Sequence, residues 1–140
     1  MLLIELDEEE NLKECEVDVQ AFVSPNLRQH NLNNLTFTQR NTGYEINAVT
    51  TTSSSGNETF VSRIFSPTMI SNGEDQVCGT AHCVMGPYWC QKQGVPSGKS
   101  VQARQVSPRG GDLILSWDEE AKCMKLFGES TIIGAGDLCF

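Results

Sequence analysis

The residues best suited to chemistry lie in one polar loop, Gly73 to His82, with the sequence GEDQVCGTAH. The loop leads into an uncharged apolar stretch that is typical of a buried helix, so its last residues form a helix start. The first amides of a helix lack intrahelical acceptors, and the helix dipole adds positive potential there. We therefore expect Gly79, Thr80 and Ala81 to bind an anion such as a substrate carboxylate. Gly79 leaves the backbone open to a ligand, and Thr80 adds a hydroxyl donor.

Two side chains beside this anion site can carry a proton. Asp75 lies just upstream, where it can orient a ligand or move a proton, so we predict a catalytic role for it. Cys78 immediately precedes the helix, and a helix N-terminus lowers the pKa of a thiol. This position predicts that Cys78 is more reactive than Cys123, and that it is a second catalytic residue.

The same residues have a structural interpretation. Asp75 is also typical of a turn cap, Cys78 of core packing and Gly79 of a tight corner. Helix starts rich in small polar residues are common, so spacing alone favours neither interpretation.

A zinc site is a further alternative, because four potential ligands lie close in the sequence: Cys78, His82, Cys83 and Cys90. Cys83 and Cys90 are separated by about two helical turns, roughly 10 Å along the axis. Zinc–sulfur bonds measure about 2.3 Å, so one ion does not reach both thiols. We predict no metal site, and we interpret His82 as a hydrogen-bonded core histidine. The six cysteines are expected to be free, buried thiols.

Composition narrows the class of protein. The 140 residues are 39% hydrophobic and 20% charged, which is typical of one globular domain over residues 1–140. The net charge is -8, and without a basic patch we expect no binding to nucleic acid. No apolar run reaches the roughly 18 residues of a membrane span, so we expect no membrane contact. The start, MLLIELDEEE, lacks the basic residues of a signal peptide, and we expect a cytoplasmic protein.

The elements that position the loop at 73–82 are predicted to be mostly β-strands. Short or alternating apolar runs predict strands over residues 1–6, 44–50, 60–65, 100–106, 112–117, 122–127 and 130–133. Asp7 is expected to cap a helix carrying Leu12 and Cys15. Residues 17–22 fit either helix or strand, and residues 26–42 are expected to form a loop.

One long helix is predicted from Gly79 to about Gln93. Its apolar residues cover almost every side of a helical wheel, which predicts burial all round. Pro87 is expected to kink it. The predicted fold class is α+β, with a curled, mostly antiparallel sheet around one central buried helix.

Four segments together resemble the C-terminal half of the PhzF-like, or phenazine biosynthesis-like, isomerase family: RIFSP at 63–67, the loop at 73–82, Tyr88-Trp89, and QVSPRGGDL at 105–113. The resemblance is strongest from residue 60 onward. It implies a single C-terminal lobe, residues 1–140, of the diaminopimelate-epimerase-like fold, whose active site lies between two lobes. Residue by residue, the family's catalytic aspartate corresponds to Asp75, and its helix-start Gly-Ser pair to Gly79-Thr80.

The resemblance implies a cofactor-independent isomerase or epimerase that moves a proton on a small carboxylate substrate. The family's acid/base glutamate belongs to an N-terminal lobe that these residues lack, so the expected partner is that missing lobe or a second copy in a homodimer. Such a chain should expose a large apolar patch and self-associate. Gln76 replaces the family's usual proline and Cys78 a common threonine, although the Cys78-Gly79-Thr80 step is similar to that of diaminopimelate epimerases. The alternatives are a cysteine-based racemase and a non-catalytic binding protein.

Overall fold

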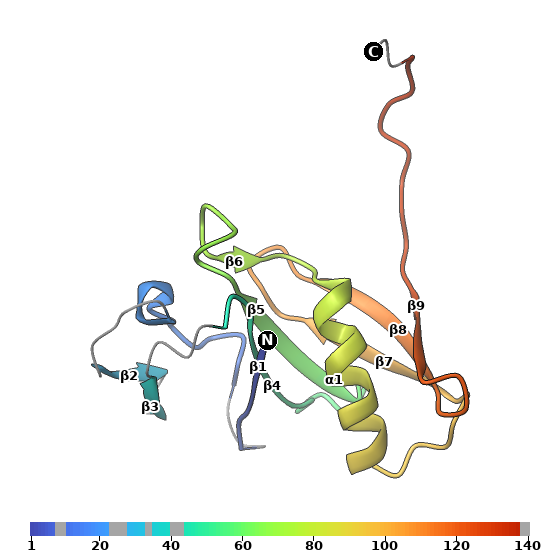
Figure 1. The fold of residues 1–140 in the computed structure, drawn as a ribbon, viewed down its shortest axis with the longest axis horizontal. Helices are drawn as coiled ribbons and strands as arrows, with labels where there is room; N and C mark the ends of the chain where they lie inside the picture. The colour runs from blue at the N-terminus through green and yellow to red at the C-terminus, as the bar shows by residue number, and fades with distance from the viewer. Residues whose placement is uncertain (8–10, 23–27, 33–34, 40–43, 138–140) are drawn as a thin grey trace.

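The computed structural model describes residues 1–7, 11–22, 28–32, 35–39 and 44–137. Within these residues a mixed β-sheet carries one α-helix, α1 (Gly79–Lys92), against its face (Figure 1). The strands of the sheet are β1 (Leu2–Glu5), β4 (Asn47–Thr52), β5 (Phe60–Phe65), β6 (Glu74–Asp75), β7 (Ser100–Gln105), β8 (Gly111–Asp118) and β9 (Cys123–Phe127). Their order across the sheet is β1-β4-β5-β7-β8-β9, with β6 beside β5. The predicted α+β class is confirmed.

Two parallel pairings make the sheet mixed. β1 runs parallel to β4, with Leu2 opposite Asn47, and β5 runs parallel to β7, with Phe60 opposite Ala103. The pairs β4–β5, β5–β6, β7–β8 and β8–β9 are antiparallel.

The edge of β5 that faces away from β4 is shared by two strands. β7 pairs with Phe60–Ser62, and β6 pairs with Ile64–Phe65 farther along β5. The end of β6 and the end of β7 therefore lie side by side, and this arrangement brings residues about 30 positions apart in the sequence into contact.

Helix α1 covers one face of the sheet. Ala81, Met85 and Trp89 are buried against apolar side chains of β4, β5, β7 and β8. The Trp89 ring stacks on Phe60 with centroids 5.7 Å apart, and its indole N–H donates to Thr50 Oγ1 at 3.0 Å. Burying one large apolar side chain contributes about 1.5–3 kcal/mol to folding, so this face is the main source of stability.

The N-terminal segment covers the other face. Leu6, Leu12 and Phe22 form a second cluster with Val49 and Phe65. Phe22 belongs to a short 3-10 helix, η1 (Val19–Phe22), and stacks on Phe65 at 5.2 Å.

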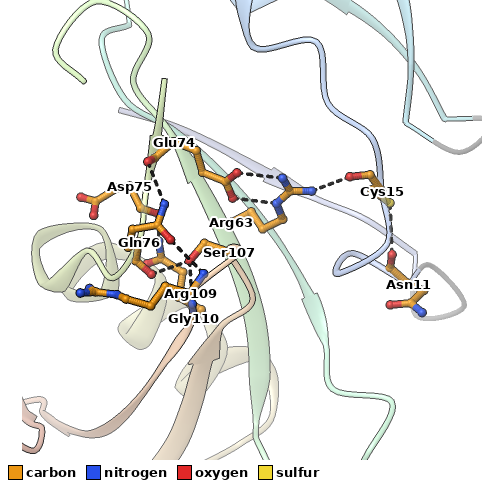
Figure 2. Close-up of polar contacts among 10 residues, drawn as sticks. Asn11, Cys15, Arg63, Glu74, Asp75, Gln76, Ser107, Arg109 and Gly110 are labelled. Atoms are coloured by element: carbon orange, nitrogen blue, oxygen red, sulfur yellow. Dashed lines mark hydrogen bonds and ion pairs between the residues drawn. The ribbon is translucent and has the colours of Figure 1, made fainter. Parts of the chain in front are cut away.

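A buried ion pair joins this segment to the sheet. Arg63 on β5 makes two hydrogen bonds of 2.8 Å to the Glu74 carboxylate and a third, of 2.5 Å, to the Cys15 carbonyl (Figure 2). The guanidinium is thereby satisfied although almost no water reaches it.

The predicted extent of the helix is confirmed, but its burial all round is not. Val84 is 52% exposed, and Thr80, Cys83 and Gln91 are exposed beside it. The sheet covers only one side of α1, and no described segment covers the other. Pro87 lies inside a continuous helix.

Three predicted elements differ in the structure. Leu12 and Cys15 are buried, but residues 11–18 form a turn and irregular chain; residues 8–10, next to the expected cap Asp7, lie outside the described residues. Within the predicted loop 26–42, β2 (Arg28–Leu32) and β3 (Leu35–Gln39) form an antiparallel hairpin. Residues 130–133 form no strand, and Ile132 and Ile133 are 89% and 99% exposed. A strand needs a partner, which a local pattern does not supply.

Candidate functional site

The loop between β6 and α1 is short and tightly held. Cys78 is the N-cap of α1 with an extended backbone, and Gly79 is the first helical residue. Asp75 Oδ1 accepts a hydrogen bond from the Val77 amide at 3.2 Å, which closes a turn. The structural role considered for Asp75 is thus present, and it fixes the orientation of a half-buried carboxylate.

All five predicted site residues lie at or just before this helix start: Asp75, Cys78, Gly79, Thr80 and Ala81. Burial raises the pKa of the Cys78 thiol, and the charge of Asp75 and its hydrogen bond with the thiol raise it further. The amides of Ala81 and Thr80 act in the opposite direction, but they are outweighed.

The direction of this shift is opposite to the one expected from the sequence. A helix N-terminus stabilises a thiolate, but here burial and a neighbouring carboxylate stabilise the thiol more. The low pKa predicted for Cys78 is wrong, and the protonated thiol is the prevailing form at neutral pH.

Gln105, at the end of β7, fixes the loop by hydrogen bonds to its backbone. We did not predict this role from the sequence. Its Nε2 donates to the Asp75 carbonyl, and its Oε1 accepts the Cys78 N–H at 2.8 Å. The side chain is fully buried, so both ends of the amide are satisfied by the loop alone. Its sequence signal is a glutamine at an inward-facing position of an alternating strand.

The turn after β7 holds the loop from a second side (Figure 2). The Ser107 hydroxyl donates to the Gln76 carbonyl at 2.6 Å, and the Arg109 amide donates to Gln76 Oε1 at 3.0 Å. Gly110 adopts a left-handed backbone with φ +68°, and its amide donates to Ser107 Oγ. A Cβ on Gly111 would lie 2.4 Å from Val77 Cγ2, so the turn and the loop are in close contact. These contacts give a physical account of the QVSPRGGDL motif.

His82 fixes the helix start from within the core. Its Nδ1 donates to the Cys78 carbonyl at 2.7 Å, and its Nε2 lies 3.4 Å from the Ser62 hydroxyl. Since a carbonyl only accepts, Nδ1 carries the proton and Nε2 faces the hydroxyl. Burial lowers the pKa of His82, which keeps the ring neutral. The interpretation as a hydrogen-bonded core histidine is confirmed.

The five described cysteines form no disulfide with one another, and the expectation that all of them are buried is wrong. Cys15 and Cys90 are buried, Cys78 is half-buried, and Cys83 and Cys123 are exposed. Across the part of the chain that the structure describes, no three His, Cys, Asp or Glu side chains are grouped so that they could hold a metal ion.

An open groove of about 910 Å³ begins beside the helix start. Its lining includes Val77, Gly79, Arg109, Leu126 and Phe127. A Cβ placed on Gly79 would meet only Leu126 Cδ2, at 3.9 Å, so space for a ligand exists over this residue. Of the predicted binding residues, Gly79 and Thr80 are exposed, whereas Ala81 is buried and offers only its amide.

Comparisons with known proteins agree on one family. The sequence model of the family described as phenazine biosynthesis-like protein matches residues 1–136. An uncharacterized isomerase of Halalkalibacterium halodurans is 35% identical over 111 residues, which are 79% of this chain and 34% of that protein. An uncharacterized isomerase of Pseudomonas aeruginosa is 38% identical over 78 residues, which are 55% of this chain and 27% of that protein.

A solved structure shows the same relationship. The crystal structure of a phenazine biosynthesis protein of the PhzF family from Enterococcus faecalis has a TM-score of 0.62 and 29% identity, and it covers 93% of this chain. This chain spans 44% of that structure and about a third or less of the curated relatives named above. Among the helices that could be described, none is long and apolar enough to cross a bilayer.

Proposed function

The chain belongs to the phenazine biosynthesis-like protein family, and from this premise we propose that it supplies the Asp75 half of an isomerase or epimerase site. The substrate is a small carboxylate, and the reaction moves a proton between the substrate and protein side chains, with no cofactor in that step. The observation that carries the proposal is the oriented Asp75 carboxylate, held by the Val77 amide at the exposed start of α1.

The proposed chemistry is general acid–base catalysis. Asp75 in its ionised form takes a proton from a substrate carbon, and it returns the proton at the same or another carbon, so that atoms and charge balance. Val77 holds one carboxylate oxygen, and Gln105 holds the backbone on both sides of the loop. The loop then needs little reorganisation during the transfer.

In this proposal Cys78 stays protonated and does not act as the base. The raised pKa of its thiol makes it a poor base at neutral pH, which disfavours the cysteine-based racemase. A thiol that keeps its proton adds no negative charge next to Asp75, which leaves Asp75 as the acid/base group of this half of the site.

The rest of the site is proposed to come from a second lobe or from a second copy of this chain. The solved relative is more than twice as long as this chain, which spans 44% of it. Exposed apolar side chains on α1, β8, β9 and the segment after β9 support a partner: Val84, Ile114, Leu126, Phe127, Ile132 and Ile133. Light scattering that shows a strictly monomeric chain at high concentration would contradict self-association.

Exchange of substrate protons for deuterium tests the proposal. The chain is incubated in D₂O with a panel of amino acids and aminobenzoates, and deuterium uptake is followed by NMR. We expect Asp75→Asn to abolish uptake while carboxylates still bind, whereas Glu120→Gln, an exposed carboxylate in the turn between β8 and β9, leaves uptake unchanged.

A second variant tests the approach to the helix start. Gly79→Val should preserve the fold, because the nearest atom lies 3.9 Å from the new Cβ, but it should block binding. Carboxylate binding without any deuterium uptake would instead favour the non-catalytic binding protein.

A further inference from the structure

The helix start alone should bind a substrate carboxylate only weakly. The Asp75 carboxylate lies in the loop that leads directly into the helix, where its Oδ1 accepts the Val77 amide hydrogen at 3.2 Å. A second carboxylate placed there would meet a like charge at short range, which costs free energy. A carboxylate substrate therefore needs a cation near Asp75, in a chain whose net charge is -8.

Arg109 is placed to be this cation. Of the three arginines whose side chains the structure describes, Arg63 pairs with Glu74 and Arg104 pairs with Asp112. The Arg109 side chain is exposed and makes no ion pair with any described residue. Its guanidinium is thus available to a ligand.

The backbone at Arg109 is fixed although its side chain is exposed. Its amide donates to Gln76 Oε1 at 3.0 Å, and the adjoining Gly110 amide donates to Ser107 Oγ at 3.2 Å. Gln76 directly follows Asp75, so these bonds tie the guanidinium and the carboxylate to one short stretch of backbone. Figure 2 shows both side chains pointing to the same side of that stretch, with Gln76 between them.

The groove links Arg109 to the helix start. Arg109, Val77 and Gly79 all line it, together with apolar side chains of β9. Its lining also includes three carboxylates, Glu58, Asp112 and Glu129, so among the described residues Arg109 is the one cationic side chain in a lining that otherwise repels an anion. A ligand in the groove can therefore place an anionic group on the guanidinium and an apolar body against β9. A guanidinium binds a carboxylate with two parallel hydrogen bonds, which sets direction as well as affinity.

We propose that Arg109 binds the substrate carboxylate in the groove and is a specificity-determining residue of the site. The assignment rests on the proposed function for its substrate class. It places the substrate anion on the turn after β7 and leaves Asp75 to face the reacting carbon.

The test is a binding titration that does not depend on turnover. Two probes, 2-aminobenzoate and its neutral analogue 2-aminobenzamide, are titrated against the full chain while the amide NMR shifts of Gly79 and Gly110 are followed. We expect the carboxylate to bind and the amide to bind at least about tenfold more weakly, since a charge-assisted bidentate pair is lost.

Two variants of Arg109 and one control separate the site from general charge effects. Arg109→Met should weaken 2-aminobenzoate at least about tenfold, and Arg109→Lys should recover part of the loss, because charge returns without the planar fork. Lys99→Met is the control: it removes an exposed positive charge next to the opposite end of β7, outside the groove lining, and should change the affinity less than twofold, since salt screens unspecific charge.

Two results would overturn the assignment: equal binding of both probes, or Arg109→Met binding 2-aminobenzoate as tightly as the unchanged chain. A failure of the proposed function looks different. In that case the carboxylate still binds through Arg109, but no deuterium enters any member of the panel in the unchanged chain.

Discussion

Gln105 holds Cys78 at the start of α1: its Oε1 accepts the Cys78 amide hydrogen at 2.8 Å, while its Nε2 donates to the carbonyl of Asp75. One buried side chain thus fixes both candidate catalytic residues from a strand that lies some 30 positions later. Through this bridge, Gln105 satisfies two backbone groups of the loop, the Cys78 N–H and the Asp75 carbonyl.

The bridge predicts a large cost for its removal. Gln105→Met keeps the side-chain length but leaves a buried amide and a buried carbonyl unsatisfied, so unfolding free energy should fall by about 1–3 kcal/mol. Gln102→Met, at an exposed position of the same strand, is the control and should change stability by less than about 0.5 kcal/mol. Equal denaturation midpoints for the two variants would contradict the bridge.

The environment of Cys78 predicts slow alkylation. Since burial and the Asp75 charge raise the pKa of this thiol, iodoacetamide should modify Cys78 more slowly than the exposed Cys123 at neutral pH. Asp75→Asn removes the negative charge, so the pKa of Cys78 should fall and its rate should rise. Peptide mass spectrometry reads both rates in one sample, and Cys123 should react alike in both proteins. A Cys78 faster than Cys123 in the unchanged chain would restore the cysteine mechanism.

His82 predicts a stability that depends on pH. Its folded pKa is lowered by burial, so between that value and the ordinary value near 6.5 the unfolded state binds more protons. Stability should therefore rise with pH through this window and be lost as pH falls below about 6.5. His82→Asn retains a donor for the Cys78 carbonyl but does not titrate, so its unfolding free energy should lack this slope. Urea denaturation between pH 5 and 7, with about one unit between samples, measures the difference.

The ion pair between Arg63 and Glu74 predicts unequal effects of two arginine substitutions. Arg63→Met leaves the Glu74 carboxylate and the Cys15 carbonyl buried without their donor, and it should destabilise the chain by about 3–5 kcal/mol. Arg104→Met breaks the exposed pair with Asp112 and should cost less than about 1 kcal/mol. The midpoints of thermal unfolding of the two variants measure this difference. Similar midpoints would refute the structural role of Arg63.

The sequence predicted the helix start well because its signals are local. A polar loop followed by an uncharged stretch places Gly79 at the first turn, and Asp75 and Cys78 are close to it along the chain. Gln105 could not be found this way. Its contact with the loop depends on β6 and β7 sharing one edge of β5, and no short-range pattern encodes that arrangement.

Two other predictions, the low pKa of Cys78 and the burial of Val84, failed because both properties depend on the surroundings in the folded chain. The thiol of Cys78 was judged from the helix dipole alone, whereas burial and the Asp75 charge decide its pKa. The apolar pattern of α1 shows which side chains could be buried, but it does not show whether another segment packs on each side of the helix. Val84 was therefore expected to be buried, and it is exposed.

The two parallel strand pairs have a consequence for how the chain reaches its native state. Leu2 pairs with Asn47 and Phe60 with Ala103, so each pairing must close a loop of more than 40 residues before it gains any contact. Closing such loops costs chain entropy early, which slows the search for the native topology. During synthesis β1 emerges well before its partner β4, and β5 pairs with β4 while its other edge stays open until β7 follows. Refolding should accordingly be slow for a chain of this size, and the strands that wait are the segments most open to chaperones.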